Sequence, residues 1–115
     1  MGRARQIWDE FSAALAKGDD AAIRDLYGDG AVYLEPNNPP HEGHLLIQAY
    51  LNSWMQAREN LEVTTNRILE SEDGTTLAVE WSISYDAGGR RWHNLPRSSW
   101  LEASGEYIEY HRDYY

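Results

Sequence analysis

Cysteine is absent from this 115-residue sequence, and basic residues are scarce. The lack of cysteine excludes disulfide bonds, thiol nucleophiles and cysteine-based zinc sites. Ten lysines and arginines stand against 19 acidic residues, giving a formal net charge of −9. Because phosphate groups are bound by clustered basic side chains, this balance argues against nucleic acids and anionic membranes as partners.

Long apolar runs are absent as well. No stretch approaches the length of a membrane span, and MGRARQIWDEF lacks the apolar run of a signal peptide. We therefore expect a soluble, cytoplasmic protein. The length suits one domain, residues 1–115, and a hydrophobic content of 42% is enough for one core.

Phenylalanine is nearly missing, since one Phe stands against five Trp and eight Tyr. Trp and Tyr combine a large apolar body with a polar group. A chain rich in both is typical of a lined pocket or an interface. For any single ring, the alternative is ordinary core packing with its polar edge at the surface.

Hydrophobic spacing predicts three helices and five strands. The helices are expected at residues 4–17, 21–28 and 43–58. The strands are expected at residues 31–35, 61–71, 76–86, 90–102 and 107–115, with a bulge or edge at Pro96. This order predicts an α+β fold: a cone of three helices packed on a curved, mostly antiparallel sheet, with a pocket at its open end.

Three of the four prolines lie in YLEPNNPPHEG, residues 33–43. Each residue before a proline is disfavoured in helical angles, so this segment should be a rigid turn. A rigid turn at the rim of the cone would hold Tyr33 and Glu35 at the pocket with little ordering cost. The alternative is a stiff connection in which Glu35 only accepts amide hydrogens of the turn.

The segments LAKGDDAAIRDLYGDGAVYLEP, NPPHEGHLLIQAYL and HRDYY, with the element order, carry a family resemblance. The chain resembles the nuclear transport factor 2-like superfamily over essentially its whole length. Within it, the sequence is most similar to the SnoaL-like branch of polyketide cyclases, ketosteroid isomerases and limonene epoxide hydrolases. The resemblance implies the cone fold, a homodimer and a pocket for a small hydrophobic molecule, but the fold hosts many reactions.

Compared with ketosteroid isomerases, Glu35 before Pro36 fits the position of the general base at the end of the first strand. The Tyr and Asp that stabilise the oxyanion in those enzymes fall on Phe11 and, within about one residue, Arg97. The resemblance therefore argues against steroid isomerisation by that mechanism.

Compared with limonene epoxide hydrolases, Tyr33 matches the Tyr of a Tyr-x-Asn pattern, and Glu35 falls where the Asn would be. Asp113 matches the Asp of a late Arg-Asp-Tyr. The Arg-x-Asp pair falls on Trp81 and Ile83, so epoxide hydrolysis by that route is in doubt. Polyketide cyclases of this branch use an acidic pocket residue, a part that Asp113 or Glu35 would take.

These comparisons predict Glu35, Asp113 and Tyr33 as catalytic residues. A carboxylate among Trp and Tyr rings loses hydration, which raises its pKa toward the range of a general acid or base. One carboxylate would stay ionised while the other holds a proton, and Tyr33 and Asn94 would stabilise an oxyanion. Substrate-binding residues are predicted to be Trp8, Phe11, Trp54, Trp81, Ile83, Asn94 and His111.

Several alternatives stay open at this point. Asp113 is equally suited to a structural ion pair, for instance with Arg97. On the last strand, Ile108 and Tyr110 favour one face as the inner one and the resemblance favours the other, which carries Asp113. His41 and His44 in H-E-G-H lack the i, i+4 spacing of helical zinc ligands, so surface histidines are expected and no metal.

Two functions follow from these expectations. The first is a small-molecule enzyme without a cofactor, using pocket carboxylates for cyclisation, isomerisation or hydration of a compact hydrophobic oxygenated substrate. The second is a non-catalytic ligand-binding or assembly domain of the same fold. In either case a homodimer is expected, with its interface on the outer sheet face at Leu95, Leu101, Ile108 and Tyr110.

Overall fold

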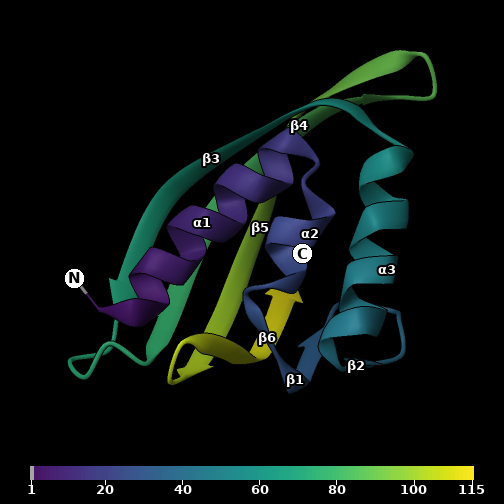
Figure 1. Ribbon diagram of the computed structural model, residues 1–115. Coiled ribbons are helices and arrows are strands. Elements are labelled where there is room, and N and C mark those ends of the chain that lie inside the picture. The colour runs from purple at the N-terminus through teal and green to yellow at the C-terminus, as the bar shows by residue number, and fades with distance from the viewer. Residues whose placement is uncertain (1) are drawn as a thin grey trace.

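Three helices cover the concave face of one six-stranded sheet in the computed structural model, which describes residues 2–115 (Figure 1). The helices are α1 (Arg3–Lys17), α2 (Asp20–Arg24) and α3 (His44–Gln56). The strands are β1 (Tyr27–Leu34), β2 (His41–Glu42), β3 (Glu59–Glu70), β4 (Thr76–Ala87), β5 (Arg90–Ser104) and β6 (Tyr107–Tyr114). This arrangement confirms the predicted α+β fold with helices on a curved sheet.

Strand order in the sheet is β2-β1-β6-β5-β4-β3, and only the β1–β6 pair is parallel. That pair sets Tyr33 opposite His111, so the first and last strands bring distant parts of the chain together. The predicted second helix ends early, at Arg24, because Tyr27 already pairs with Ile108 on β6. Tertiary pairing here overrides the helical pattern.

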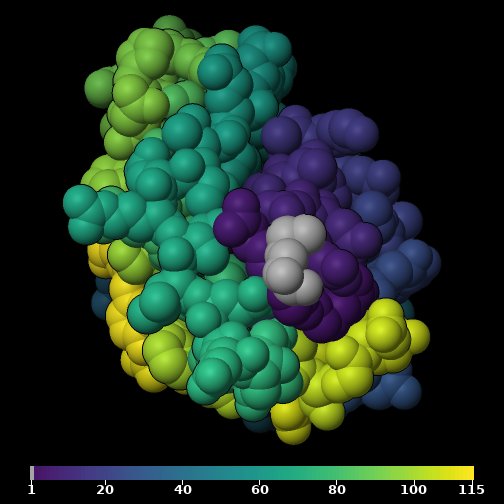
Figure 2. All heavy atoms as spheres, turned by 90° about the vertical axis from the view of Figure 1, so that its left-hand side faces the viewer, coloured from purple at the N-terminus to yellow at the C-terminus, as the bar shows by residue number. Residues whose placement is uncertain are grey.

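Helix α1 buries an apolar stripe against the sheet and lies beside β3, as Figure 2 shows from the outside. Gly2, at the helix N-cap position, has no side chain to cap the first turn. Glu70 of β3 takes this role: Oε1 accepts from the Gly2 amide at 2.9 Å and Oε2 from the Arg5 amide at 2.8 Å. The two backbone hydrogen bonds, chiefly that from Gly2, hold the pKa of Glu70 below its usual value.

Replacing Glu70 with alanine should lower the free energy of unfolding by about 1 kcal/mol, the usual cost of a lost N-terminal cap. The exposed Glu72, two residues further on, is the matched control. Urea unfolding of the two alanine variants measures the difference. Equal stability of both variants would show that this cap contributes nothing.

Two bulges decide which side chains of β5 and β6 face the helices. On β5 the extra residue lies at His93–Asn94, where Asn94 has φ 48°, and Pro96 pairs regularly with Ser82. The predicted irregularity at Pro96 is therefore displaced by two residues. On β6 the extra residue is Glu109, because Ile108 pairs with Ala103 while Tyr110 pairs with Glu102.

The bulge at Glu109 resolves the two competing expectations for β6. Ile108 is fully buried, and His111 and Asp113 are buried too, although alternation would place Ile108 on the opposite face from them. Leu101 and Ile108 therefore belong to the core, and their predicted place in a dimer interface is wrong. A groove lies on the outer face of the sheet, and the exposed apolar side chains that line it are Leu69, Trp100 and Tyr114.

None of the helices described over residues 2–115 combines the length and the apolar character needed to cross a membrane.

Candidate functional site

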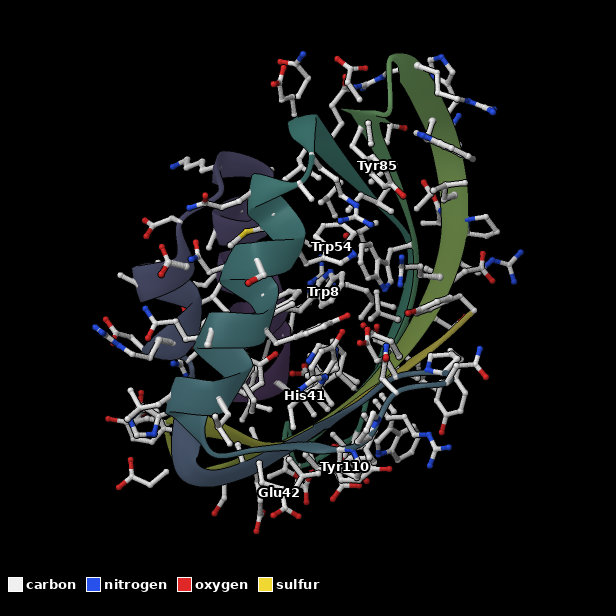
Figure 3. All side chains as sticks on the ribbon, turned by 90° about the vertical axis from the view of Figure 1, so that its right-hand side faces the viewer. Trp8, His41, Glu42, Trp54, Tyr85 and Tyr110 are labelled. Carbon is white, nitrogen blue, oxygen red and sulfur yellow. The ribbon has the colours of Figure 1, made fainter. Side chains whose placement is uncertain are left out.

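A small cavity lies between the helices and the concave face of the sheet. The space open to a water-sized sphere is about 20 Å³, which is room for one water molecule. Figure 3 shows Trp54 and His41 in the region between α3 and the sheet, whereas Glu42 and Tyr110 lie on the outer side. The cavity is lined by Phe11, Leu15, Tyr33, Glu35, Tyr50, Leu51, Trp54, Trp81, Arg97 and Asp113.

Asp113 of β6 forms the centre of a buried hydrogen-bond network. Its Oδ2 accepts from the Tyr33 hydroxyl at 2.5 Å. Its Oδ1 accepts from the Ser99 hydroxyl at 2.5 Å and from Nε2 of His111 at 2.8 Å. Register explains the arrangement, because Ser99 on β5 lies directly opposite Asp113, and Tyr33 on β1 lies opposite His111.

The network fixes the charge of Asp113. Burial raises the pKa of Asp113, but attraction to His111 and the hydrogen bonds from His111, Ser99 and Tyr33 outweigh it, so the pKa lies below its usual value. The expectation that the pocket raises the pKa of this carboxyl group is wrong. Asp113 is a stable carboxylate rather than an acid.

His111 extends the network behind the cavity. Its Nδ1 lies 2.7 Å from the Tyr27 hydroxyl, and its Nε2 must carry a hydrogen because an ionised Asp113 can only accept. Burial, and then the charge of Asp113, raise the pKa of Tyr27, so this phenol keeps its proton. His111 orients Asp113 and does not line the cavity.

Glu35 follows directly after β1, and its side chain is 3% exposed. Its Oε1 accepts from the Asn38 amide at 2.7 Å, and its Oε2 accepts from the Tyr115 hydroxyl at 3.2 Å. Asn38 belongs to the proline turn, so the turn holds Glu35 in place through this hydrogen bond. Here Glu35 accepts from the side-chain amide of Asn38.

Tyr33 lies between the two carboxyl groups. Its hydroxyl is 2.5 Å from Asp113 and 3.5 Å from Glu35. Burial, followed by the charge of Asp113, raises the pKa of Tyr33 well above its usual value. Tyr33 is therefore a permanent hydrogen-bond donor at the polar end of the cavity.

Arg97 brings a positive charge to the mouth of the cavity. Its guanidinium carbon lies 3.8 Å from the centre of the Tyr115 ring and 5.9 Å from each of the Trp54 and Trp81 rings. These distances suit cation–π attraction. The expected ion pair between Arg97 and Asp113 is not formed, since Asp113 takes its donors from Tyr33, Ser99 and His111.

Six predicted site residues line one cavity: Tyr33, Glu35 and Asp113 of the catalytic set, with Phe11, Trp54 and Trp81 of the binding set. Trp8 and Ile83 are core residues instead; the Trp8 indole donates to Thr65 and its ring packs against Trp81. Asn94 is exposed in the β5 bulge, where its backbone amide donates to Ser84, so its predicted place in the pocket is wrong.

Sequence reasoning missed Ser99, Tyr50 and Tyr115 as parts of the site. The sequence does contain a pattern that points to Ser99. An arginine followed two residues later by a polar residue, as in Arg-x-Asp, occurs at Arg97 and Ser99 on β5, with serine in place of the acid.

Among residues 2–115, no group of three or more His, Asp and Glu side chains is arranged to hold a metal ion.

Comparison with known proteins identifies the family. The profile of the SnoaL-like domain matches residues 8–108. An LEH-like epoxide hydrolase of M. tuberculosis is 25% identical, with a TM-score of 0.80 over 97% of this chain and 81% of that one. No match is found among curated proteins.

Two further solved structures share the fold. The epoxide hydrolase/cyclase-like enzyme SalBIII, which has a role in pyran ring formation in salinomycin, is 18% identical, with a TM-score of 0.82 over 96% of this chain and 88% of that one. A hypothetical protein of Catenulispora acidiphila with a ketosteroid isomerase-like fold is 20% identical, with a TM-score of 0.84 over 95% of this chain and 84% of that one. Since the family profile covers most of the chain, the protein belongs to the SnoaL-like domain family.

Proposed function

We propose that the protein is a cofactor-independent enzyme that uses two pocket carboxyl groups for acid/base chemistry on a compact, apolar, oxygen-containing molecule. The observation that carries this proposal is the position of the Tyr33 hydroxyl between Asp113 and Glu35 in a cavity with apolar walls. Pairs of carboxyl groups in different environments commonly divide acid and base roles.

The hydrogen bonds support a division of these roles between Asp113 and Glu35. Asp113 is held ionised, so it is the base that takes a proton from the attacking oxygen. A carboxylate has about four acceptor positions, and three are filled by protein donors, which leaves one for the nucleophile. Glu35 then gives a proton to the substrate oxygen whose bond to carbon breaks. The single hydroxyl hydrogen of Tyr33 stays on Asp113 and keeps that carboxylate in position.

Within this chemistry we favour opening of a strained C–O bond, either by water or by a hydroxyl group of the substrate itself. The first gives hydration and the second cyclisation. Two relatives with the same fold support this choice, an LEH-like epoxide hydrolase and an enzyme of pyran ring formation. Because Ser99 stands where an acid would be needed in Arg-x-Asp, the proton donor here would be Glu35.

A ligand-binding role without catalysis is the second candidate, and one observation favours it. All three hydrogen bonds to Asp113 come from the protein itself, as in a structural network. Binding would then depend on the apolar walls and on Arg97. The homodimer also remains a prediction. Of the interface first expected, Leu95 and Tyr110 remain candidates, and the exposed Leu69, Trp100 and Tyr114 are added to them.

A panel of compounds should distinguish the enzyme from the ligand-binding domain. The panel contains small epoxides, hydroxy-epoxides, enones, lactones and flat aromatic compounds. Thermal shift first finds the class that binds, since a ligand at a hundredfold excess over its Kd adds about 2.7 kcal/mol. Product analysis by mass spectrometry in H₂¹⁸O then detects turnover. We expect conversion of an epoxide, with ¹⁸O incorporated in hydration and absent from a cyclised product. Selective binding without turnover of any class would support the second candidate.

A further inference from the structure

The two histidines of the H-E-G-H sequence lie in different surroundings in the folded protein. His44 begins α3, with its Nδ1 3.3 Å from the fully exposed carboxylate of Asp29. His41 lies on β2 opposite Tyr33 and turns inward, with its ring stacked on Tyr50 at 4.1 Å and on Tyr33 at 5.8 Å between centroids. The expectation that both are surface histidines is therefore wrong for His41 (Figure 3).

One ring nitrogen of His41 has no partner. Its Nε2 is buried without a hydrogen bond within residues 2–115, and it lies 3.7 Å from Oε1 of Glu35. Buried polar atoms are nearly always hydrogen-bonded, and an exception calls for a physical explanation. This nitrogen is aimed at the carboxyl group to which the proposed function assigns the acid role.

Glu35 needs a route by which protons reach it. Its side chain is 3% exposed, so contact with bulk water is minimal. The Oε2 side faces the hydroxyls of Tyr33 and Tyr115, and burial above all raises the pKa of each, so neither phenol gives up its proton. The Oε1 side faces the Asn38 amide, which does not titrate, and His41.

His41 has the properties of a proton carrier between Glu35 and the solvent. Imidazole changes charge near neutral pH and can bind and release a proton at each ring nitrogen. The side chain of His41 is 18% exposed, so the ring also reaches water. The titratable groups facing it are Glu35 beyond β1, Tyr33 on β1 and Tyr50 on α3, and burial, with a smaller effect of Glu35, raises the pKa of Tyr50 as well.

We propose that His41 returns to Glu35 the proton that Glu35 delivers in each turnover. The inference rests on the proposed acid role of Glu35. The protonated imidazole gives its Nε2 proton to Oε1 of the Glu35 carboxylate, so one N–H bond breaks, one O–H bond forms and the ring is left neutral with its hydrogen on Nδ1. A proton from the solvent then forms the Nε2–H bond again and restores the imidazolium. His41 is thus a positioning and relay residue that never touches the substrate.

The kinetic test compares His41→Gln with His44→Gln, which alters the other histidine of the same motif. For His41→Gln we expect kcat to fall about tenfold with KM unchanged, less than the about 10²–10⁴-fold loss of a directly reacting acid. Added imidazole should restore kcat in proportion to its concentration, because a dissolved base then carries the proton. His44→Gln should keep the wild-type kcat and show no dependence on imidazole.

A structural role would give a different pattern. His41→Phe keeps a ring between Tyr33 and Tyr50 but carries no proton, so it should lose as much kcat as His41→Gln. Wild-type kcat in His41→Phe, or a loss in both variants that imidazole does not restore, would overturn the inference while the proposed function stands.

A second measurement needs no substrate. The ¹⁵N chemical shift of the His41 Nε2 reports whether that nitrogen carries a proton. Replacing Glu35 with glutamine removes the titratable group that lies 3.7 Å from Nε2, so the pH dependence of this shift should change, with no change at His44. An unchanged pH dependence of the His41 shift would overturn the relay even if no substrate class is turned over.

Discussion

Replacing Asp113 with asparagine is expected to lower the free energy of unfolding by about 3–5 kcal/mol at neutral pH, the cost of removing one partner from a buried charged network. The side chain is 5% exposed and accepts from Tyr33, Ser99 and His111. An asparagine amide would turn two of its own hydrogens toward donors that need an acceptor.

The effect of Asp113 should disappear in acid. Its pKa is lowered in the folded protein, so its stabilising contribution is present above the ordinary aspartate pKa of about 3.9 and is lost as the pH falls through the folded-state value. The wild type and Asp113→Asn should therefore converge in stability as the pH falls below that range. Urea unfolding measured at neutral and at acidic pH tests this expectation.

Asp25→Asn is the matched control, because this carboxylate is exposed and pairs with the neighbouring Arg24 at 3.1 Å. It should change stability by no more than about 0.5 kcal/mol at either pH. If Asp113→Asn is as stable as Asp25→Asn at neutral pH, the buried network does not stabilise the fold.

Replacing Glu35 with glutamine is expected to reduce kcat about 10²–10⁴-fold, the usual contribution of a general acid or base, while the protein stays folded. Glutamine keeps an oxygen that accepts from Asn38 or Tyr115, so the turn retains its anchor. Its amide hydrogens are not acidic, so it cannot transfer a proton to the leaving oxygen. Steady-state kinetics with the converted substrate, together with thermal unfolding, separates the loss of chemistry from the loss of structure.

Glu42→Gln controls for the change of charge, since Glu42 is exposed on the outer side of the sheet (Figure 3). It should retain wild-type kcat. If Glu35→Gln also retains kcat, Glu35 is not the acid. If ligand affinity survives in Glu35→Gln and no variant shows turnover, the binding role is the better description.

Most of the fold could be predicted from the spacing of apolar residues within single helices and strands. The apolar spacing of α1 places Ile7, Trp8 and Phe11 on one buried face, as observed. The alternation in β4 likewise puts Leu77, Val79, Trp81 and Ile83 inward. Both patterns depend on neighbouring residues only, so the sequence displays them directly.

Features that depend on a partner strand could not be predicted in this way. The sequence predicts Asn94 in the pocket, but the β5 bulge exposes it. Simple alternation also leaves the inner face of β6 undecided. The extra residue Glu109 lets Ile108 before it and His111 after it both face the core. Ser99 enters the site only through its register with Asp113, and that register is a property of two strands together.

The parallel pairing of β1 with β6 also has a kinetic consequence. Tyr33 and Asp113 are 80 residues apart in sequence, and their contact needs β6 seated between β1 and β5. Contacts of such long range close large loops and form slowly. We expect the hairpins of β3, β4 and β5 to form early and the candidate site to be completed with the final docking of β6, so that partly folded chains would expose the ring face of Tyr33 but have no assembled site.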